Sequence, residues 1–356
     1  MKRRILAGLA CACVLLSGCS SLLDREYVSV TPHVTTETEE GDPSVLRAES
    51  YQELVNALVH LVSQHAESGT VRLYGDAERL DEDLDRACLE VVQEVPLGAY
   101  AVDYIKYSTV SAESVVTYSQ AEVEISYRRT REQVDSIVSA TGRSALQNEF
   151  SAALERCDGE TVLRISHFSE DEAYIRSVFR QAYLSSPAAG VDMPELTVAI
   201  YPQQGLQRIV EVRMQYPGTP EDYAARTRSL QEIARTLTFP LLALPVPERV
   251  SAAADALLLR ARHDPEAGGT AWHALDAGPA NAQGMAMALR LLCEQLEINC
   301  LVVSGTRDGQ PHFWNAVSLD DLWVCLDLSG DTPAALQSWD ELAQKGYDWS
   351  DDLLFG

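Results

Sequence analysis

The stretch Gly309–Asp327, GQPHFWNAVSLDDLWVCLD, has the pattern of two apolar strands joined by an acidic turn. His312 opens the first strand, and Asp327 closes the second. A histidine that takes a proton and a carboxylate that orients its imidazole are two of the three parts of a nucleophilic site. The stretch therefore raises the question of which residue would supply the nucleophile.

A helix is predicted just upstream, in the segment AQGMAMALRLLCEQL that begins at residue 282. One face of this helix carries Met285, Leu289, Leu292 and Leu296. Asn281 is placed to cap the first free backbone donors, and the dipole favours an anion in the first turn. A thiolate at residue 282 would therefore complete a cysteine acyl-transfer site with His312 and Asp327. The residue at that position is Ala282.

These segments together resemble the transglutaminase-like superfamily, whose papain-like core has a helix beginning CxGxA, a strand with HAWN and a strand ending in W(Y)xxD. The matching segments here are TAWHAL, AQGMAMALRLL, HFWNAV and DDLWVCLD, in that order, over roughly the last hundred residues. The resemblance implies that His312 is the general base and Asp327 the orienting residue, with Ala282 at the nucleophile position. The cleft residues that it implies are Gln283, Gly284, Trp314 and Asn315.

Ala282 excludes the covalent mechanism of this family, because a methyl group cannot be deprotonated or form a thioester. Cys293 lies three helical turns further on, too far for proton transfer to His312. Cys325 points to the same strand face as Asp327 and is either a replacement nucleophile or a small apolar strand residue. His312 and Asp327 are then either the remnant of a ligand pocket or a hydrogen-bonded pair that stabilises the sheet.

The region upstream contains a duplication. Residues 70–92 align with residues 161–183 at a shift of 91, so that one apolar helical stripe occurs twice. Each copy has the pattern of a helix, a strand, a helix and a two-strand hairpin, and neither gathers convergent His, Cys, Asp or Glu residues. We predict an α+β fold in which two α-β-α-β-β repeats precede a papain-like, transglutaminase-like domain. The predicted bounds are 45–142, 143–240 and 241–356, the last boundary marked by the prolines of FPLLALPVPE.

The first residues predict export. MKRR is cationic, ILAGLACACVLL is apolar but too short to span a bilayer with such flanks, and LSGC follows at once. This arrangement resembles the bacterial lipobox, which implies a signal peptide over residues 1–18, lipidation of Cys19 and a polar tether over residues 19–44. We expect the protein at the extracytoplasmic face of the cell membrane. The lipid on Cys19, which includes palmitate, would be the anchor.

The charge and the cysteine content limit the classes of partner and cofactor that this protein is expected to bind. The chain has 53 acidic and 28 basic residues, and loss of the signal would leave a net charge of about −28. A surface this acidic is repelled by phosphates, so we expect no nucleic-acid partner. The five cysteines beyond Cys19 are scattered and form no CxxC or His-rich cluster, which favours buried thiols and no metal or other cofactor.

The expected function is noncatalytic: the domain binds a peptide or cell-envelope ligand in the remnant cleft or serves as a surface scaffold. Two alternatives stay open. One is an active cysteine-type amide hydrolase or acyltransferase that uses Cys325 or an unrecognised nucleophile. The other is a partner-docking protein that acts through the duplicated α+β region.

Overall fold

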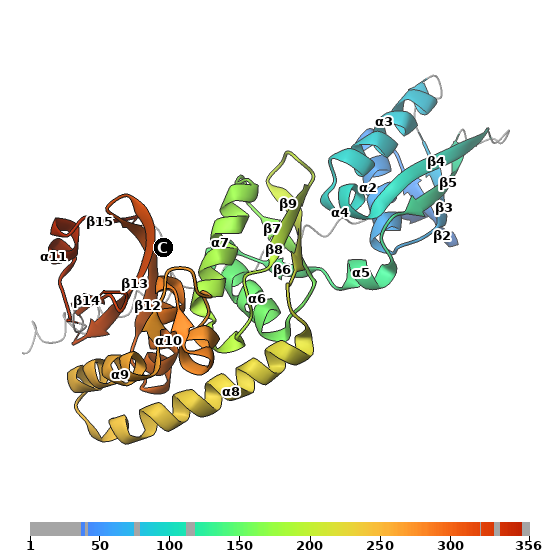
Figure 1. Ribbon diagram of the computed structural model, residues 1–356. Coiled ribbons are helices and arrows are strands. Elements are labelled where there is room, and N and C mark those ends of the chain that lie inside the picture. The colour runs from blue at the N-terminus through green and yellow to red at the C-terminus, as the bar shows by residue number, and fades with distance from the viewer. Residues whose placement is uncertain are drawn as a thin grey trace, which may run out of the picture.

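The computed structural model describes residues 37–39, 42–74, 79–111, 118–320, 322–330 and 335–350. The predicted signal peptide, Cys19 and the tether up to residue 36 lie outside these ranges. Figure 1 shows three larger sheets of four or five strands along the chain, each packed against helices, with the long α8 (Pro220–Thr238) running beside the second and third. This arrangement confirms the predicted α+β class. No helix among the described residues has the length and apolarity needed to cross a membrane.

The first unit is a five-stranded sheet with the strand order β1-β2-β3-β5-β4. Leu58 of α2, Leu84 of α3 and Val123 of β5 are buried in the core between helices and sheet. Ser50 caps α2 by accepting a hydrogen bond from the Glu53 backbone, which fixes where the helix begins. The elements are β1 (Thr38–Glu39), β2 (Asp42–Ala48), α2 (Tyr51–Ser63), β3 (Ser68–Leu73), α3 (Leu80–Gln93), α4 (Pro96–Ala101), β4 (Val102–Ser111) and β5 (Ser119–Tyr127).

The second unit repeats this topology. Its sheet has the order β6-β7-β9-β8, which matches β2-β3-β5-β4, and in both sheets the first pair is parallel and the others are antiparallel. The predicted α-β-α-β-β succession is present in each copy. It is preceded by β1 and β2 in the first copy and by β6 in the second, strands that the sequence pattern did not predict. The elements are β6 (Val138–Ala140), α6 (Gly142–Arg156), β7 (Glu160–Ser166), α7 (Glu172–Ser185), η2 (Pro187–Ala189), β8 (Glu195–Tyr201) and β9 (Gln207–Gln215).

The duplicated helical stripe is the buried face of α3 and of α7. Aliphatic and aromatic side chains at i, i+3, i+4 and i+7 fall on one side of a helix, and burying that side against the sheet drives the packing. The buried residues are Leu84, Ala87, Cys88 and Val91 in α3 and Ile175, Val178, Phe179, Ala182 and Tyr183 in α7.

The C-terminal part is a four-stranded antiparallel sheet with the order β14-β13-β12-β15, packed on α10. The opening stretch forms the predicted pair of strands, β13 and β14, joined at Asp320, whose φ is 49°. The elements are η3 (Phe239–Ala243), α9 (Val246–Arg260), β10 (Arg262–His263), the π-helical turn His273–Ala277, β11 (Pro279–Ala280), α10 (Ala282–Gln295), β12 (Cys300–Arg307), β13 (Gln310–Leu319), β14 (Leu322–Leu326), α11 (Trp339–Gln344) and β15 (Tyr347–Trp349).

The helix α9 ends at Arg260. Arg262 and His263 beyond it pair in parallel with Pro279 and Ala280, so the chain is extended there rather than helical. Helical periodicity could not show this, because the pairing partner lies beyond the next loop.

One continuous apolar core extends from Ala140 in the second unit to Leu328 in the C-terminal part. It includes Leu230 of α8, Val250 of α9 and Leu289 of α10, all fully buried. Residues on both sides of the proline-rich stretch 239–248 therefore share one core. The domain boundary predicted there stays a prediction.

Candidate functional site

His312 and Asp327 are brought together by the β13–β14 pair. His312 lies in β13, and Asp327 is the first residue after β14, which pairs antiparallel with β13 from Leu319 to Asn315. His312 Nε2 lies 2.9 Å from Asp327 Oδ2. An ionised carboxylate can only accept hydrogen bonds, so Nε2 carries the proton and donates it.

Asp327 accepts hydrogen bonds from three side chains. Besides His312, the Ser329 hydroxyl donates to Oδ1 at 2.7 Å, and the Tyr347 hydroxyl donates to Oδ2. The Ser329 backbone N–H also donates to Oδ1 at 2.8 Å, and Arg307 forms an ion pair with Oδ2 at 3.6 Å. Burial alone would raise the pKa of Asp327, but the hydrogen bonds from His312, Ser329 and Tyr347 outweigh it and hold the pKa well below its usual range. The site therefore contains a firmly ionised carboxylate.

The hydrogen bond to Asp327 fixes the orientation of the His312 imidazole. With Nε2 engaged, Nδ1 is the acceptor nitrogen, and it has no hydrogen-bond partner among the residues that the structure describes. Ser329 Oγ lies 3.1 Å from the same Nε2 and donates its own proton to Asp327. Ser329 is therefore part of the carboxylate's hydrogen-bond shell rather than a nucleophile that His312 could deprotonate. An oriented imidazole with a free Nδ1 is the arrangement of a general base.

The two faces of β13 have different neighbours. His312 and Trp314 project to one face, where their rings are stacked with centroids 6.3 Å apart and Tyr347 lies edge-on to both. Asn315 projects to the opposite face, since side chains alternate along a strand, and donates from Nδ2 to the Ala286 carbonyl of α10 at 2.9 Å. Trp314 and Asn315 are both completely buried. The regular strand thus directs His312 away from the face that packs on α10.

The N-terminus of α10 is built as predicted. Asn281 Oδ1 accepts from the Gly284 N–H at 3.1 Å, and Ala282 is the first helical residue and is partly exposed. Gln283 Nε2 donates to the Gly269 carbonyl at 2.8 Å. A Cβ on Gly284 would lie 2.9 Å from the carbonyl oxygen of Thr270, so only glycine permits this close approach. Gln283 and Gly284 therefore fasten the helix start to the preceding loop.

Of the predicted site residues, the structure brings His312, Asp327 and Trp314 into one cluster. Ala282, Gln283 and Gly284 form a second group around the loop before α10, and Asn315 ties β13 to this helix. No hydrogen bond or ring contact between the two groups is present among the described residues. The structure thus brings His312 and Asp327 together, whereas residue 282, where the sequence resemblance implies a nucleophile, carries only a methyl group.

The thiols near the site are poorly suited to act as nucleophiles. Cys325 is completely buried, and its backbone exchanges hydrogen bonds with Gln337 at 2.7 and 2.9 Å. Burial raises the pKa of the Cys325 thiol to about 12, and only the Trp314 side chain opposes this shift. Cys293 is also fully buried, and its neighbour Cys300 together with burial raises its pKa. Neither thiol would form an appreciable amount of thiolate at neutral pH.

Three residues that contact Asp327 were not predicted from the sequence. Ser329 follows the aspartate at i+2, a spacing typical of a local Asp–backbone turn, and this signal could have identified it. Arg307 reaches the site through the pairing of β12 with β13, and Tyr347 through the pairing of β15 with β12, which no local pattern indicated. No group of three or more His, Cys, Asp or Glu side chains in the described ranges is arranged to hold a metal ion.

Comparisons with known proteins give distant structural matches. No protein-family model and no curated protein matches the chain. A transglutaminase structure aligns at 16% identity with a TM-score of 0.28, covering 59% of this chain and 65% of its own. A proposed cysteine protease from Cytophaga hutchinsonii aligns at 11% identity and a TM-score of 0.26, covering 41% and 66%. A proposed protease from Parabacteroides distasonis aligns at 10% identity and a TM-score of 0.23, covering 77% and 45%.

The chain thus spans less than two thirds of each of these three proteins. TM-scores this low do not establish a shared fold, and the titles describe those proteins alone.

Proposed function

We propose that the C-terminal part is a transglutaminase-like domain that no longer performs acyl transfer and acts as a noncatalytic binding or scaffold module. The order of the four sequence segments supports this assignment, as does the hydrogen-bonded His312–Asp327 pair with its free Nδ1. The ligand class of this proposal is a peptide or another cell-envelope component, bound beside His312. The export signal predicted from the first 18 residues and the lipobox-like LSGC ending at Cys19 support a lipid-anchored protein at the extracytoplasmic face of the membrane.

Ala282 is the observation that carries the proposal. It occupies the first position of α10, where the helix dipole would stabilise a thiolate, and it has no ionisable group. The alternative enzyme would need Cys325, whose burial and raised pKa both oppose thiolate formation. Loss of a nucleophile typically reduces turnover by several orders of magnitude.

The substitution Ala282→Cys tests whether the missing thiol is what prevents catalysis. The variant should be labelled by iodoacetamide at residue 282 near neutral pH because the dipole of α10 favours the thiolate, and the wild type should not be labelled there. Because His312 lies on the face of β13 opposite α10, peptide amide cleavage by the variant requires that His312 still reaches the new thiol; the wild type should show no cleavage. Labelled sites are identified by mass spectrometry of the folded protein. Ala282→Ser is the matched control, since an unactivated hydroxyl should neither label nor restore cleavage.

Two results would contradict the proposal. Amide cleavage by the wild type that is lost in His312→Ala would show that another nucleophile is active. Rapid labelling of Cys325 in the folded wild type, abolished by the same substitution, would identify that thiol as the nucleophile. Alignment of the base with the new thiol is checked by comparing Ala282→Cys with the double variant that also lacks His312.

A further inference from the structure

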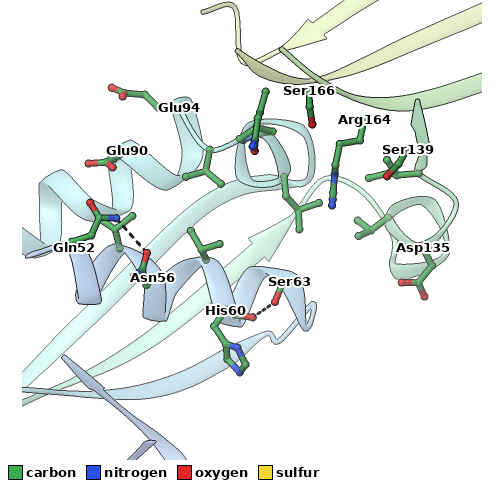
Figure 2. A pocket seen from close by; sticks show the side chains of 18 of the residues that line it. Gln52, Asn56, His60, Ser63, Glu90, Glu94, Asp135, Ser139, Arg164 and Ser166 are labelled. Atoms are coloured by element: carbon green, nitrogen blue, oxygen red, sulfur yellow. Dashed lines mark hydrogen bonds between the residues drawn. The ribbon is translucent and has the colours of Figure 1, made fainter. Parts of the chain in front are cut away.

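A cavity of about 780 Å³ lies between the first and second units and is lined only by residues between Gln52 and Gln207. Figure 2 shows α2 on one side and the second sheet with the α5 (Arg131–Asp135) segment on the other. Its volume is within the range of pockets that enclose small-molecule ligands. The site is separate from His312 and Asp327.

The cavity exists because α4 covers only part of the outer face of the second sheet. Along β7, Val162, Arg164 and Ser166 alternate with core residues and so face away from the helices of their own unit. Val162 packs against Tyr100 and Ala101 of α4 in a small apolar core. Arg164 and Ser166 lie beside this contact, at the cavity wall.

Arg164 is a half-buried cation without a counterion. Figure 2 shows its side chain extending into the space between the second sheet and α2, with no interaction drawn to it. It has no hydrogen-bond or ion-pair partner among the described residues, and burial alone lowers its pKa. By contrast, Arg129 and Arg213 of the same region both pair with Glu211. Desolvating a guanidinium without a partner is unfavourable, so an anion in the cavity would be stabilised there.

The other lining residues define what kind of anion fits. Apolar side chains form much of the wall, including Val59, Leu97 and Ile137. The carboxylates of Glu90, Glu94 and Asp135 lie toward the edge and would repel a phosphate or a polyanion. A planar guanidinium binds one carboxylate through two parallel hydrogen bonds. A ligand with one carboxylate on an apolar body therefore matches the charge of Arg164 and the apolar lining of the cavity.

We propose that this cavity binds a small apolar monocarboxylate, held by Arg164 through its carboxylate and by the valine, leucine and isoleucine side chains through its apolar part. Two sources present this chemistry: a short apolar peptide with a free C-terminus, and a medium-chain fatty acid. The site does not depend on the proposed function of the C-terminal part.

Calorimetric titration of the full-length, detergent-solubilised protein tests the site and separates the two sources. The probes are the tripeptide Ala-Leu-Val, its C-terminal amide, and octanoate. We expect saturable binding of the free peptide or of octanoate, and a binding curve for only one of them identifies the source. Loss of the charge-assisted contact, by the amide or by Arg164→Met, should weaken binding by about tenfold to a hundredfold. Arg176→Met, at an exposed arginine of α7 in the same unit, is the matched control.

A second variant tests the cavity without touching Arg164. Ser139 lines the cavity from β6, directly across from Arg164, and is exposed, so Ser139→Trp should fill the space and abolish binding. Because Arg164 has no partner to lose, the unfolding temperature of Arg164→Met should equal or exceed that of the wild type. The proposal is overturned if neither carboxylate probe binds at millimolar concentration, if both variants bind like the wild type, or if Arg164→Met is strongly destabilised.

Discussion

At the scale of single residues, Asp327 determines the state of the candidate site. Its carboxylate collects hydrogen bonds from His312, Ser329 and Tyr347, and its side chain is only 6% exposed. The same contacts that keep it ionised hold the imidazole of His312 in one orientation, with Nε2 occupied. The chemistry that remains available at His312 is therefore proton acceptance at Nδ1.

Replacing Asp327 should change how stability depends on pH. The folded pKa of Asp327 is held below its unfolded value, so its stabilising effect is complete above the ordinary carboxyl range near pH 4 and is lost as pH falls. We expect Asp327→Asn to lower the free energy of unfolding by about 2 kcal/mol at pH 7. That deficit should shrink progressively below about pH 4 in urea titrations. Asp255→Asn, at an exposed aspartate of α9, is the control, and an equal deficit at every pH would refute the expected role.

At the scale of elements, α10 and β13 are joined by one buried amide. Asn315 donates to the Ala286 carbonyl at 2.9 Å and to the Leu301 carbonyl at 3.3 Å. It thereby links the first turns of the helix to two neighbouring strands. In the resemblance to transglutaminase-like proteins Asn315 is only a companion of the histidine, whereas its contacts here give it a structural role on the opposite face of β13.

Removing this amide should destabilise the C-terminal part. Asn315→Ala deletes these two hydrogen bonds and a third to Cys300 Sγ, and leaves a small buried void, which should lower the free energy of unfolding by about 2 kcal/mol. Urea denaturation followed by tryptophan fluorescence is a suitable measurement, because Trp314 lies next to the substituted residue. Asn299→Ala, at an exposed asparagine in the loop before β12, should change stability by less than about 0.5 kcal/mol. Equal effects of the two substitutions would contradict the role given to Asn315.

At the scale of the whole molecule, the two repeats are held together through Glu211 of the second sheet. Arg129, from the segment that follows β5, donates to both oxygens of Glu211 at 2.9 and 2.7 Å. The side chains of Arg129 and Glu211 are 14% and 3% exposed. Beside them, Tyr100 and Ala101 pack on Val162 and Ile209. This junction also holds the two units at the separation that leaves the cavity lined by Arg164 between them.

Breaking the ion pair should loosen the junction between the repeats. Arg129→Met leaves Glu211 buried with one cation fewer, at a cost of about 3 kcal/mol. We expect faster proteolysis in the segment between β5 and β6, measured by mass spectrometry of the fragments. Arg131→Met is the matched control, since Arg131 is 64% exposed in its pair with Asp135 and should contribute little. An unchanged cleavage rate in Arg129→Met would show that the apolar contact alone holds the repeats.

The sequence by itself determined the features that depend on local order and period. The 91-residue shift indicated the repeat, helical spacing gave the buried stripes of α3 and α7, and Asn281 indicated where α10 begins. The absence of a nucleophile at residue 282 also needed only the sequence. These features could be predicted because propensity, capping and amphipathic patterning act over a few neighbouring residues.

The tertiary structure alone decided which distant residues meet. Tyr347 reaches Asp327 through the pairing of β15 with β12, and Arg307 through the pairing of β12 with β13. The additional parallel strands β2 and β6 depend on partners across a helix. The packing of α4 on the second sheet leaves Arg164 at the wall of a cavity, where it has no counterion among the described residues. Such contacts arise from pairing and burial between segments far apart in the chain, which no local pattern specifies.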